Sequence, residues 1–587
     1  MPERDPTCIG RVQHVLGAQV TVALDEDLAG VAPIFRGRLQ PIGQIGSLVR
    51  IPQGLVDLIA TVSLLGISEL AGVQKPAEVV QTGERWLQVQ LLGEIDRGTG
   101  RFQRGVGSYP GLDDPVHFAT SEHLIAVFPQ PDEDHLHLGR LAAAEDVPVC
   151  LNAGHLVLRH AAVTGSTGAG KTSAVASLLQ GFVAGGWCNA NIVVIDPHSE
   201  YTQALGPNAA TRSVLGKGDC QLRVPFWALP SDDILRVFTG GTGGATTAKR
   251  FAELTRLARQ KFVTEANWLN LDPAAVTADT PVPFDINSVW FELDYLNNET
   301  RDNKTDPNTV RIEDPGDATK LRPARFAPYN PGGAAPHQAP TYGNYGSTPE
   351  VLRLGLLDKR LQFFLQPTPD PRGKTDPLVA EMVEWLGSKK PISVLDFGGV
   401  PDEAAELAIG VVLNLLFEVA IRSEPDGPGI GRPSPVLVVL EEAHRYLGDG
   451  AVPLAGAAAN RIAREGRKYG VGLMLVTQRP SELPDTALAQ CGTLIALRLT
   501  NSQDQGKIRA ALPDNVAGLA AALPALRTGE AIVSGEAMVL PARMLIKPPN
   551  PFPRAEDPSL RPWRDPKSKP NLAPPLAAWR GTYEEGK

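Results

Sequence analysis

Short runs of apolar residues, separated by turn residues, fill about the first 130 residues of the chain. Within several runs apolar and polar residues alternate with the period of a β-strand, and glycines recur between the runs. Short strands at even spacing indicate a small closed or nearly closed β-barrel over 1–130. The predicted strands have the sequences IGRVQHV, AQVTVAL, GSLVRIP, LIATVSLLGIS, RWLQVQLLGEI and HLIAVF.

From about residue 157 the pattern changes to nearly continuous apolar runs that are separated by helical stretches. Strands that are apolar throughout are typical of a parallel sheet that helices cover on both faces. We therefore predict an α/β core with a mainly parallel sheet, built from two parts of the chain, 131–230 and 391–546. Its predicted strands lie in LRHAAVTG, NIVVID, ISVLDF, PVLVVLEE, VGLMLVT and TLIALRLT.

Two polar, proline-rich stretches interrupt this pattern. Residues 301–345 are predicted to form a long, partly mobile insertion within a helical subdomain over 231–390. Ten prolines between Pro548 and Pro575 predict that 547–587 is an extended arm. Such an arm either lies across a neighbouring subunit or is disordered, and the sequence leaves both alternatives open.

The composition excludes a chain that is disordered throughout. Hydrophobic residues make up 43% of the 587 positions, which is enough for the cores of two to four domains. Lys and Arg total 56 against 65 Asp and Glu, so the formal net charge is −9. An acidic total argues against a protein that coats nucleic acid by bulk charge, although a local basic channel is compatible with it.

The sequence predicts neither a disulfide framework, nor a zinc site, nor a membrane anchor. The five cysteines are scattered, odd in number and without a CxxC pair. The N-terminus lacks an apolar signal-peptide core, and the most apolar stretch, 408–421, is interrupted by Asn414 and Glu418. We therefore expect a cytoplasmic protein that does not associate with a membrane.

The strongest motif follows the first predicted strand of the core. The segment GSTGAGKT fits G-x-x-x-x-G-K-[ST], with the apolar AAVT before it and the helical pattern SAVASLLQGF after it. Glycines let backbone N–H groups surround phosphates, Lys171 neutralises the β and γ oxygens, and Thr172 offers a hydroxyl to Mg²⁺. ATP and Mg²⁺ are the cofactors expected here. The predicted nucleotide-binding residues are Gly165, Ser166, Thr167, Gly168, Ala169, Gly170, Lys171, Thr172, Ser173 and Asp196.

A second predicted core strand, PVLVVL, ends in the two carboxylates Glu441 and Glu442. Alternation along a strand makes these side chains point in opposite directions. We expect Glu441 to orient the Mg²⁺ shell together with Thr172, and Glu442 to face the γ-phosphate and polarise the attacking water. Solvated turn residues are the alternative for such a pair.

Two more polar residues end predicted strands at the carboxyl edge of the sheet, where ligands bind in open α/β folds. Gln478 follows VGLMLVT and is a candidate for a hydrogen bond to the γ-phosphate or to the attacking water. Asp196 ends NIVVID and either faces the nucleotide or caps its own loop.

Hydrolysis by P-loop motors usually needs a cation at the γ-phosphate, which a neighbouring subunit often supplies. Arg464 and Arg467, on the helix that precedes VGLMLVT, are the first candidates for this role, and Arg159 is another. The alternative is a solvated basic face, because Arg461, Arg464 and Lys468 share one side of that helix.

Together these motifs resemble the HerA family of hexameric P-loop ATPases of the HerA/FtsK group, and the resemblance is to the bacterial type. The similarity covers roughly 8–200 and 390–545, with Ser199 where glycine is usual in the family and with 301–345 unmatched. The similar segments, in chain order, are FQRGVGSYPGLDDPV, LHLGRL, LRHAAVTGSTGAGKT, IDPHSEY, LEEAHRYL, RIAREGRKYG, VTQRPSELP, LRLTNSQD and GEAIVSGEAMVLP.

This resemblance implies a RecA-like core, an N-terminal barrel of the HAS type and a homohexameric ring with the barrels on one face. Double-stranded DNA would pass through the central pore without sequence specificity. The residues that carry over by position as ATPase residues are Lys171, Thr172, Glu441, Glu442, Gln478, Arg464 and Arg467.

Three functions are compatible with the resemblance. The first is an ATP-driven DNA translocase or helicase that acts with a NurA-type nuclease, bound at the barrel face, in DNA end processing or repair. The second is an ATPase scaffold that regulates a sirtuin-type NADase or nuclease effector in an antiphage defence complex. The third is a secretion-type motor at a membrane, against which the lack of any predicted anchor counts.

A basic stretch over 247–262, TAKRFAELTRLARQKF, is a candidate for contact with DNA phosphates. Its basic residues are Lys249, Arg250, Arg256, Arg259 and Lys261. An amphipathic surface helix without a role in DNA binding is the alternative.

Overall fold

A computed structural model gives the fold of the chain. The structure describes residues 5–25, 34–35, 38–39, 45–67, 85–128, 132–214, 219–241, 243–266, 268–365, 370–373, 375–447, 453–513, 517–554, 560–564 and 570–580. It divides the chain into two compact units. One comprises 1–211, 386–396 and 413–554, and the other comprises 212–385, 397–412 and 555–587.

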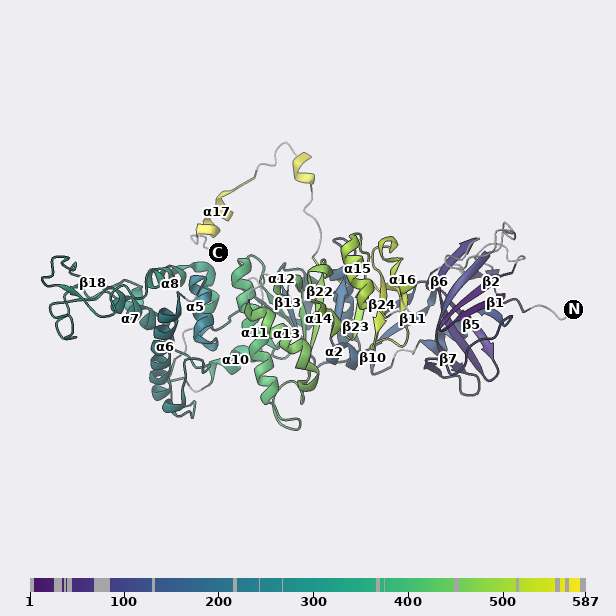
Figure 1. The fold of residues 1–587 in the computed structure, drawn as a ribbon, viewed down its shortest axis with the longest axis horizontal. Coiled ribbons are helices and arrows are strands. Elements are labelled where there is room, and N and C mark those ends of the chain that lie inside the picture. The colour runs from purple at the N-terminus through teal and green to yellow at the C-terminus, as the bar shows by residue number, and fades with distance from the viewer. Residues whose placement is uncertain are drawn as a thin grey trace. The chain divides into compact units, whose positions relative to one another are not determined.

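A closed antiparallel β-barrel opens the first unit (Figure 1). Six strands follow one another in the order β2-β1-β9-β5-β6-β7, and β7 pairs with β2 to close the ring. Buried valines, leucines and isoleucines from alternate positions fill the interior, among them Val20, Ile51 and Val89. The strands are β1 (Cys8–Leu16), β2 (Gln19–Leu24), β5 (Leu48–Gln53), β6 (Val56–Ile67), β7 (Arg85–Asp96) and β9 (Pro115–Phe118), with β8 (Phe102–Arg104) added beside β7.

The predicted barrel is thus present, but one of its predicted strands is wrong. HLIAVF lies in helix α1 (Ser121–Val127), and the remaining place in the ring belongs to β9. Leu124, Val127 and Phe128 recur at helical spacing, and all three are buried in the large apolar cluster that continues into the α/β core. The apolar residues of this run therefore fit a helix better than the two-residue period of a strand.

The α/β core contains every core strand that the apolar runs predict, in a twelve-stranded sheet. The parallel strands are β12 (Ala161–Thr164), β13 (Asn191–Asp196), β20 (Ile392–Asp396), β21 (Val436–Leu440), β22 (Val471–Thr477) and β23 (Thr493–Ala496). Along the sheet they follow the order β23-β12-β22-β21-β13-β20, after which come β14 (Ala209–Ser213) and β15 (Cys220–Gln221). Because neighbouring parallel strands end at one edge, the residues after β12, β21 and β22 come together.

An antiparallel extension of the sheet adjoins β23. Strand β24 (Glu530–Gly535) pairs with β23, and β25 (Ala542–Ile546), β10 (His135–Leu141) and β11 (Ala144–Asn152) follow in turn. Helix α3 (Lys171–Ala184) packs against β12 and β10, and helix α13 (Pro453–Tyr469) packs against β22. The extension thus continues the sheet beside the strand that leads into the P-loop.

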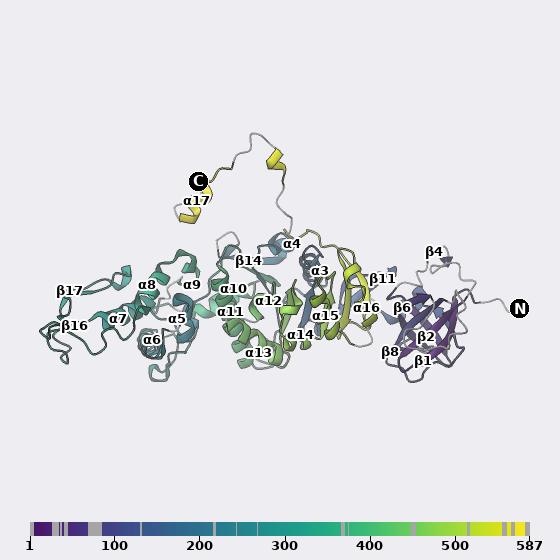
Figure 2. The same ribbon diagram turned by 45° about the horizontal axis from the view of Figure 1, so that its top comes forward.

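The second unit is mainly helical. Its helices include α5 (Ser231–Thr239), α6 (Ala245–Glu265), α7 (Ile286–Asn298), α8 (Thr348–Leu357) and α10 (Pro377–Trp385), and Figure 2 shows α5 to α8 together with the insertion. The structure describes all of 301–345. This segment contributes two small antiparallel pairs, β16 (Thr300–Arg301) with β19 (His337–Gln338) and β17 (Ile312–Asp314) with β18 (Arg325–Phe326).

One described helix is long and apolar enough to cross a membrane by length and composition. This stretch, Ala404–Arg422, belongs to α11 (Asp402–Arg422), and 72% of it is buried inside the protein. The core helix of a protein without any membrane segment has the same properties.

The proline-rich C-terminal segment begins on the α/β core. The backbone N–H of Asn550 donates to Gln180 Oε1 over 2.8 Å, and Gln180 Nε2 donates to the carbonyl oxygen of Pro551 over 2.9 Å. Beyond these contacts the structure describes the short turn Arg561–Arg564 and helix α17 (Ala573–Arg580). The other parts of the predicted arm, 555–559, 565–569 and 581–587, lie outside the described residues.

Candidate nucleotide-binding site

The P-loop connects the end of β12 at Thr164 to the start of α3 at Lys171. Gly168 and Gly170 have φ angles of +73° and +100°, a region that side chains other than glycine rarely adopt. A Cβ atom on Gly165 would lie 2.9 Å from Leu497 Cβ, so the first glycine is required by packing. The loop thus has the strand, turn and helix context that the motif needs to bind phosphates.

Three backbone hydrogen bonds attach the P-loop to neighbouring segments of the chain. Gly165 N–H donates to the carbonyl oxygen of Thr477 over 3.3 Å, and Ser166 N–H donates to that of Arg498 over 2.8 Å. Gly529 N–H donates to the carbonyl oxygen of Ala169 over 3.2 Å. The loop is therefore held from both sides before any ligand binds, which lowers the entropic cost of binding.

Lys171 is half-buried, with Nζ 3.4 Å from the carbonyl oxygen of Ser166. Burial lowers the pKa of this ammonium group, while the nearby carboxylates of Glu442, Glu441 and Glu200 act in the opposite direction. Lys171 therefore supplies positive charge beside these acids. A group that neutralises phosphate oxygens must supply such a charge.

The two carboxylates after β21 have different surroundings. Glu441 is buried and accepts a hydrogen bond from the Tyr201 hydroxyl, and burial raises the pKa of the Glu441 carboxyl to about 8. Glu442 has a φ of +50°, and its buried Oε2 atom has no hydrogen-bond partner among the described residues. An unsatisfied buried carboxylate oxygen beside a P-loop fits a group that binds water or ligand there.

His444 lies close to this free oxygen. Its Nδ1 atom is 3.3 Å from Glu442 Oε2 and 3.0 Å from Thr477 Oγ1. Burial lowers the pKa of the imidazole, while the carboxylate of Glu442 acts in the opposite direction.

The other two predicted residues of the carboxyl edge differ in what they contact. Gln478 Oε1 accepts a hydrogen bond of 2.7 Å from Thr167 Oγ1 and so touches the P-loop. The Oδ1 and Oδ2 atoms of Asp196 accept hydrogen bonds from the backbone N–H groups of His198 and Tyr201, and burial raises the pKa of the Asp196 carboxyl to about 7. Asp196 thus has the contacts of a residue that caps its own loop.

The predicted arginines lie at the opposite edge of the sheet from the P-loop. Arg464 and Arg467 are exposed near the end of α13, which leads into the start of β22, and neither has a hydrogen-bond or ion-pair partner among the described residues. β22 has seven residues; at about 3.3 Å per residue, about 20 Å separate its start from its end beside the P-loop. Arg159 ends α2 (Ala153–Leu158) and forms an ion pair with Glu536.

Some residues of the site were not predicted from the sequence. Thr172 Oγ1 donates a hydrogen bond of 2.8 Å to Oε2 of Glu200, and Tyr201 and His444 contact the two glutamates after β21. The available signal was the position of Glu200 and Tyr201 in the turn after a core strand that ends at the same edge as the P-loop.

The site suits a metal that arrives with a nucleotide. The described residues contain no group of three or more His, Cys, Asp and Glu side chains that could hold a metal by themselves. Mg²⁺ at a nucleotide site takes only one or two protein ligands and completes its shell with phosphate oxygens and water. The Thr172 hydroxyl, which contacts the carboxylate of Glu200, therefore fits such an ion.

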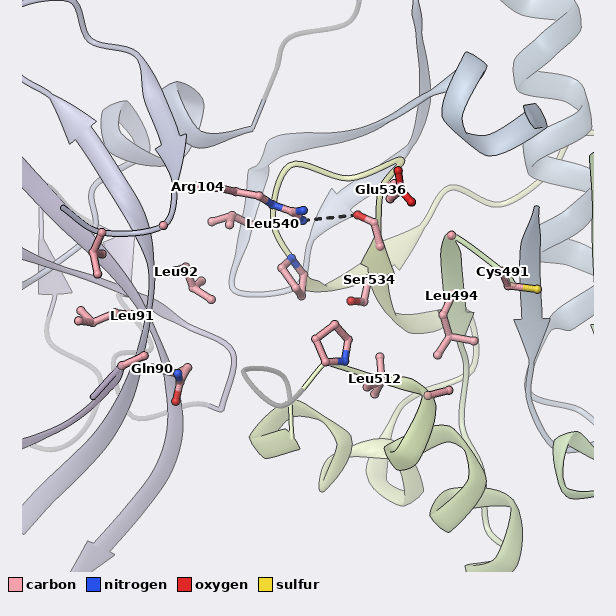
Figure 3. A pocket seen from close by; sticks show the side chains of 18 of the residues that line it. Gln90, Leu91, Leu92, Arg104, Cys491, Leu494, Leu512, Ser534, Glu536 and Leu540 are labelled. Carbon is pink, nitrogen blue, oxygen red and sulfur yellow. Dashed lines mark hydrogen bonds between the residues drawn. The ribbon is translucent and has the colours of Figure 1, made fainter. Parts of the chain in front are cut away.

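Two hollows in the first unit differ in chemistry. One, of about 700 Å³, borders the P-loop and is lined by polar residues that include Ser166, Thr167 and Gln478. The other, of about 680 Å³, lies between the barrel and the antiparallel extension and has a mixed lining, in which Leu91, Leu494 and Leu540 accompany Arg104 and Glu536 (Figure 3). The guanidinium group of Arg104, in this lining, donates to the carbonyl oxygens of Val539 and Met538.

Comparison with known families gives two adjoining matches. A family model for the central domain of the helicase HerA matches residues 136–416, and a model for the helicase HerA-like C-terminal domain matches residues 412–550. Together they span the P-loop, both glutamates after β21 and Gln478.

Individual relatives are archaeal helicases. The DNA double-strand break repair helicase HerA of Pyrococcus furiosus is 26% identical over 470 residues, which are 78% of this chain and 76% of that protein. A probable helicase of Methanocaldococcus jannaschii is 26% identical over 488 residues, 82% of this chain and 83% of that protein. The DNA double-strand break repair helicase HerA of Saccharolobus solfataricus is 41% identical over 108 residues, 18% of this chain and 22% of that protein.

Solved structures with related architecture have low similarity. VirB4 of Thermoanaerobacter pseudethanolicus has a TM-score of 0.44 and 14% identity, and covers 71% of this chain and 97% of that chain. The plasmid coupling protein TrwB in complex with ADP and Mg²⁺ has a TM-score of 0.40 and 13% identity. The match covers 73% of this chain and 92% of that chain. Neither likeness is strong enough to transfer the role of any residue.

Proposed function

Because this chain belongs to the HerA helicase family, we propose that it is a Mg²⁺-dependent ATPase that drives DNA translocation or unwinding in DNA end processing. The observation that carries the proposal is the meeting of Lys171, Thr172, Glu442 and Gln478 at one edge of the sheet. Parallel pairing of β12 with β22 and of β22 with β21 brings these residues together from distant parts of the chain.

The residues divide the work of ATP hydrolysis among them. The P-loop amides and Lys171 bind the phosphates, and Glu442 polarises the attacking water and takes its proton. Gln478, through its contact with Thr167, senses whether the γ-phosphate is present. Mg²⁺, when bound through Thr172 with Glu441 orienting its shell, neutralises charge on the β- and γ-phosphate oxygens.

Assembly as a homohexamer supplies a cation from the neighbouring copy. The position of Arg464 and Arg467 about 20 Å from the P-loop edge supports action on the nucleotide of a neighbouring copy rather than on their own. Ring assembly also provides the central pore for double-stranded DNA, which the motor would grip through phosphates without reading sequence.

A nuclease partner at the barrel face completes the proposed function. This part rests on membership of the family and on the name of the Pyrococcus furiosus relative, a DNA double-strand break repair helicase. An ATP-driven motor that delivers DNA to a nuclease would couple hydrolysis to resection of a broken end.

The test measures ATP hydrolysis by the purified full-length protein with and without linear double-stranded DNA. We expect Glu442→Gln to retain ATP binding and ring assembly while hydrolysis falls by at least about 100-fold, because the amide cannot accept the proton of water. Lys171→Ala is the control, and it should lose ATP affinity as well. Hydrolysis at the wild-type rate by Glu442→Gln would place the general base elsewhere, and a wild-type protein without ATPase activity would contradict the proposed function.

A further inference from the structure

Three acidic side chains besides Glu442 end or follow core strands at the edge of the sheet where the P-loop lies, but two of them are already engaged. Asp196 uses both carboxylate oxygens to accept backbone N–H groups of the turn that follows β13. Glu441 is enclosed at the end of β21 and accepts the hydroxyl of Tyr201. The remaining acid, Glu200, is partly exposed, and its Oε2 atom accepts the Thr172 hydroxyl over 2.8 Å.

The local sequence turns Glu200 toward the P-loop. Ser199 has a φ of +59°, the left-handed conformation that usually calls for glycine, and its hydroxyl donates to Asp396 Oδ1 over 2.7 Å. This hydrogen bond holds the strained residue in place. The reversal at Ser199 sets Glu200 immediately before α4 (Tyr201–Leu205), at the same edge as Thr172.

The backbone of Glu200 is fixed as well. Its carbonyl oxygen accepts the N–H of Arg554 over 2.9 Å, so the first part of the C-terminal segment lies against it. Gln180, two turns along α3 from Thr172, binds Asn550 and Pro551 of the same segment. Glu200 is therefore positioned by β13 on one side and by 550–554 on the other.

We propose that Glu200 is a positioning residue that orients the Thr172 hydroxyl for the metal bound with the nucleotide. A hydroxyl group has one proton and two lone pairs. When the proton is committed to Glu200, the lone pairs of Thr172 Oγ1 are free for the metal, and the negative charge of the carboxylate makes that oxygen a better ligand. Residues that orient a metal ligand in this way commonly change metal affinity by about 10- to 100-fold when they are removed.

This inference rests on the proposed function, because it concerns the metal at the proposed ATP site. The test measures binding of a fluorescent ADP analogue to the full-length protein in EDTA and across a series of Mg²⁺ concentrations. For Glu200→Ala we expect an unchanged affinity for the ADP analogue in EDTA. The Mg²⁺ concentration at which the effect of Mg²⁺ on analogue binding is half-maximal should rise at least tenfold. Glu200→Gln keeps an acceptor oxygen and should be affected less. Asp485→Asn removes one carboxylate charge from an exposed position and should behave like wild type.

A double-mutant cycle separates action through Thr172 from a general effect of charge. Thr172→Val removes the hydroxyl, and in that background Glu200→Ala should cause no further change in the Mg²⁺ requirement. Additive effects of the two substitutions, or an unchanged Mg²⁺ requirement in both Glu200 variants, would overturn the inference while the proposed function stands. A fall in ADP affinity that is equal with and without Mg²⁺ would reduce Glu200 to a structural role. Failure of the wild-type protein to bind the analogue at all would instead refute the proposed function.

Discussion

The carboxyl group of Glu441 makes the stability of the nucleotide-free protein depend on pH. Burial raises its pKa to about 8, above an ordinary value of 4.5, so the folded state binds this proton more tightly than the unfolded state. The stability that the proton provides is complete below about pH 4.5 and is lost as the pH rises through about 8. We expect the free energy of unfolding to fall across this range, by at most about 1.4 kcal/mol per pH unit for this one group.

Urea unfolding of the nucleotide-free protein at several pH values measures this slope. Glu441→Gln should flatten it, although burial also raises the pKa of Asp196, which adds a slope of the same sign. Tyr201→Phe removes the hydrogen bond that lowers the pKa of Glu441 and so partly offsets the effect of burial. The stability should then be lost over a higher pH range. An identical slope in wild type and in Glu441→Gln would contradict a protonated Glu441 in the folded protein.

At the residue scale, the sequence predicted best those groups that lie within continuous motifs. Lys171, Thr172 and Gln478 follow directly from the P-loop string and from the ends of apolar strands, and the structure brings them to one edge. Glu200 could not be found this way, because its direction depends on the left-handed turn at Ser199 and on a hydrogen bond to Asp396 from a distant strand. Sequence spacing counts residues, whereas the direction of a side chain after a turn depends on backbone angles.

At the scale of elements, helix α6 shows how burial changes the meaning of a basic stretch. Arg259 is fully buried, its guanidinium group donates to the carbonyl oxygens of Trp227, Leu229 and Ala278, and it lies 5.1 Å from the centre of the Phe284 ring. The expectation that Arg259 contacts DNA is therefore wrong. Lys249 and Lys261 of the same helix are exposed, and for them contact with DNA stays a prediction.

We predict that Arg259→Met destabilises the helical unit by about 2–4 kcal/mol, because buried carbonyl oxygens lose their donors. Lys249→Ala is the matched control on the exposed face and should change the free energy of unfolding by less than about 0.5 kcal/mol. Thermal unfolding followed by circular dichroism gives both values. A stable Arg259→Met variant with weakened DNA binding would restore the role expected from the sequence.

The errors in predicted elements have a common physical origin. The run HLIAVF is too short for its pattern to separate a helix from a strand, and packing of Leu124, Val127 and Phe128 into the core selects the helix. The local sequence pattern also does not predict which strands pair with each other. β10 and β25 are far apart in the chain, and they meet through the register of Gly139 with Ile546. The parallel strands were easier to predict, because apolar runs buried on both faces stand out in the sequence.

At the scale of the whole molecule, a net charge of −9 is compatible with DNA handling if the proposed ring forms. A pore needs positive potential only along its inner surface, and the outer face can remain acidic. The ring also decides which arginine meets which nucleotide. Arg467 lies beyond the start of β22 and Glu442 follows the end of β21, so the two residues belong to opposite edges of one sheet.

Mixing two inactive variants tests whether Arg467 acts between subunits. Arg467→Ala and Glu442→Gln should each lower ATP hydrolysis by at least about 100-fold when assembled alone. In a one-to-one mixture, about a quarter of the interfaces would pair an intact Glu442 with an intact Arg467 from the neighbouring copy. We expect these interfaces to restore hydrolysis, measured as phosphate release after the variants are unfolded and reassembled together. Lys171→Ala mixed with Glu442→Gln is the control, because both substitutions affect the same half of the site and no hybrid interface is complete. Rescue in the control, or none with Arg467→Ala, would show that Arg467 does not complete the site of its neighbour.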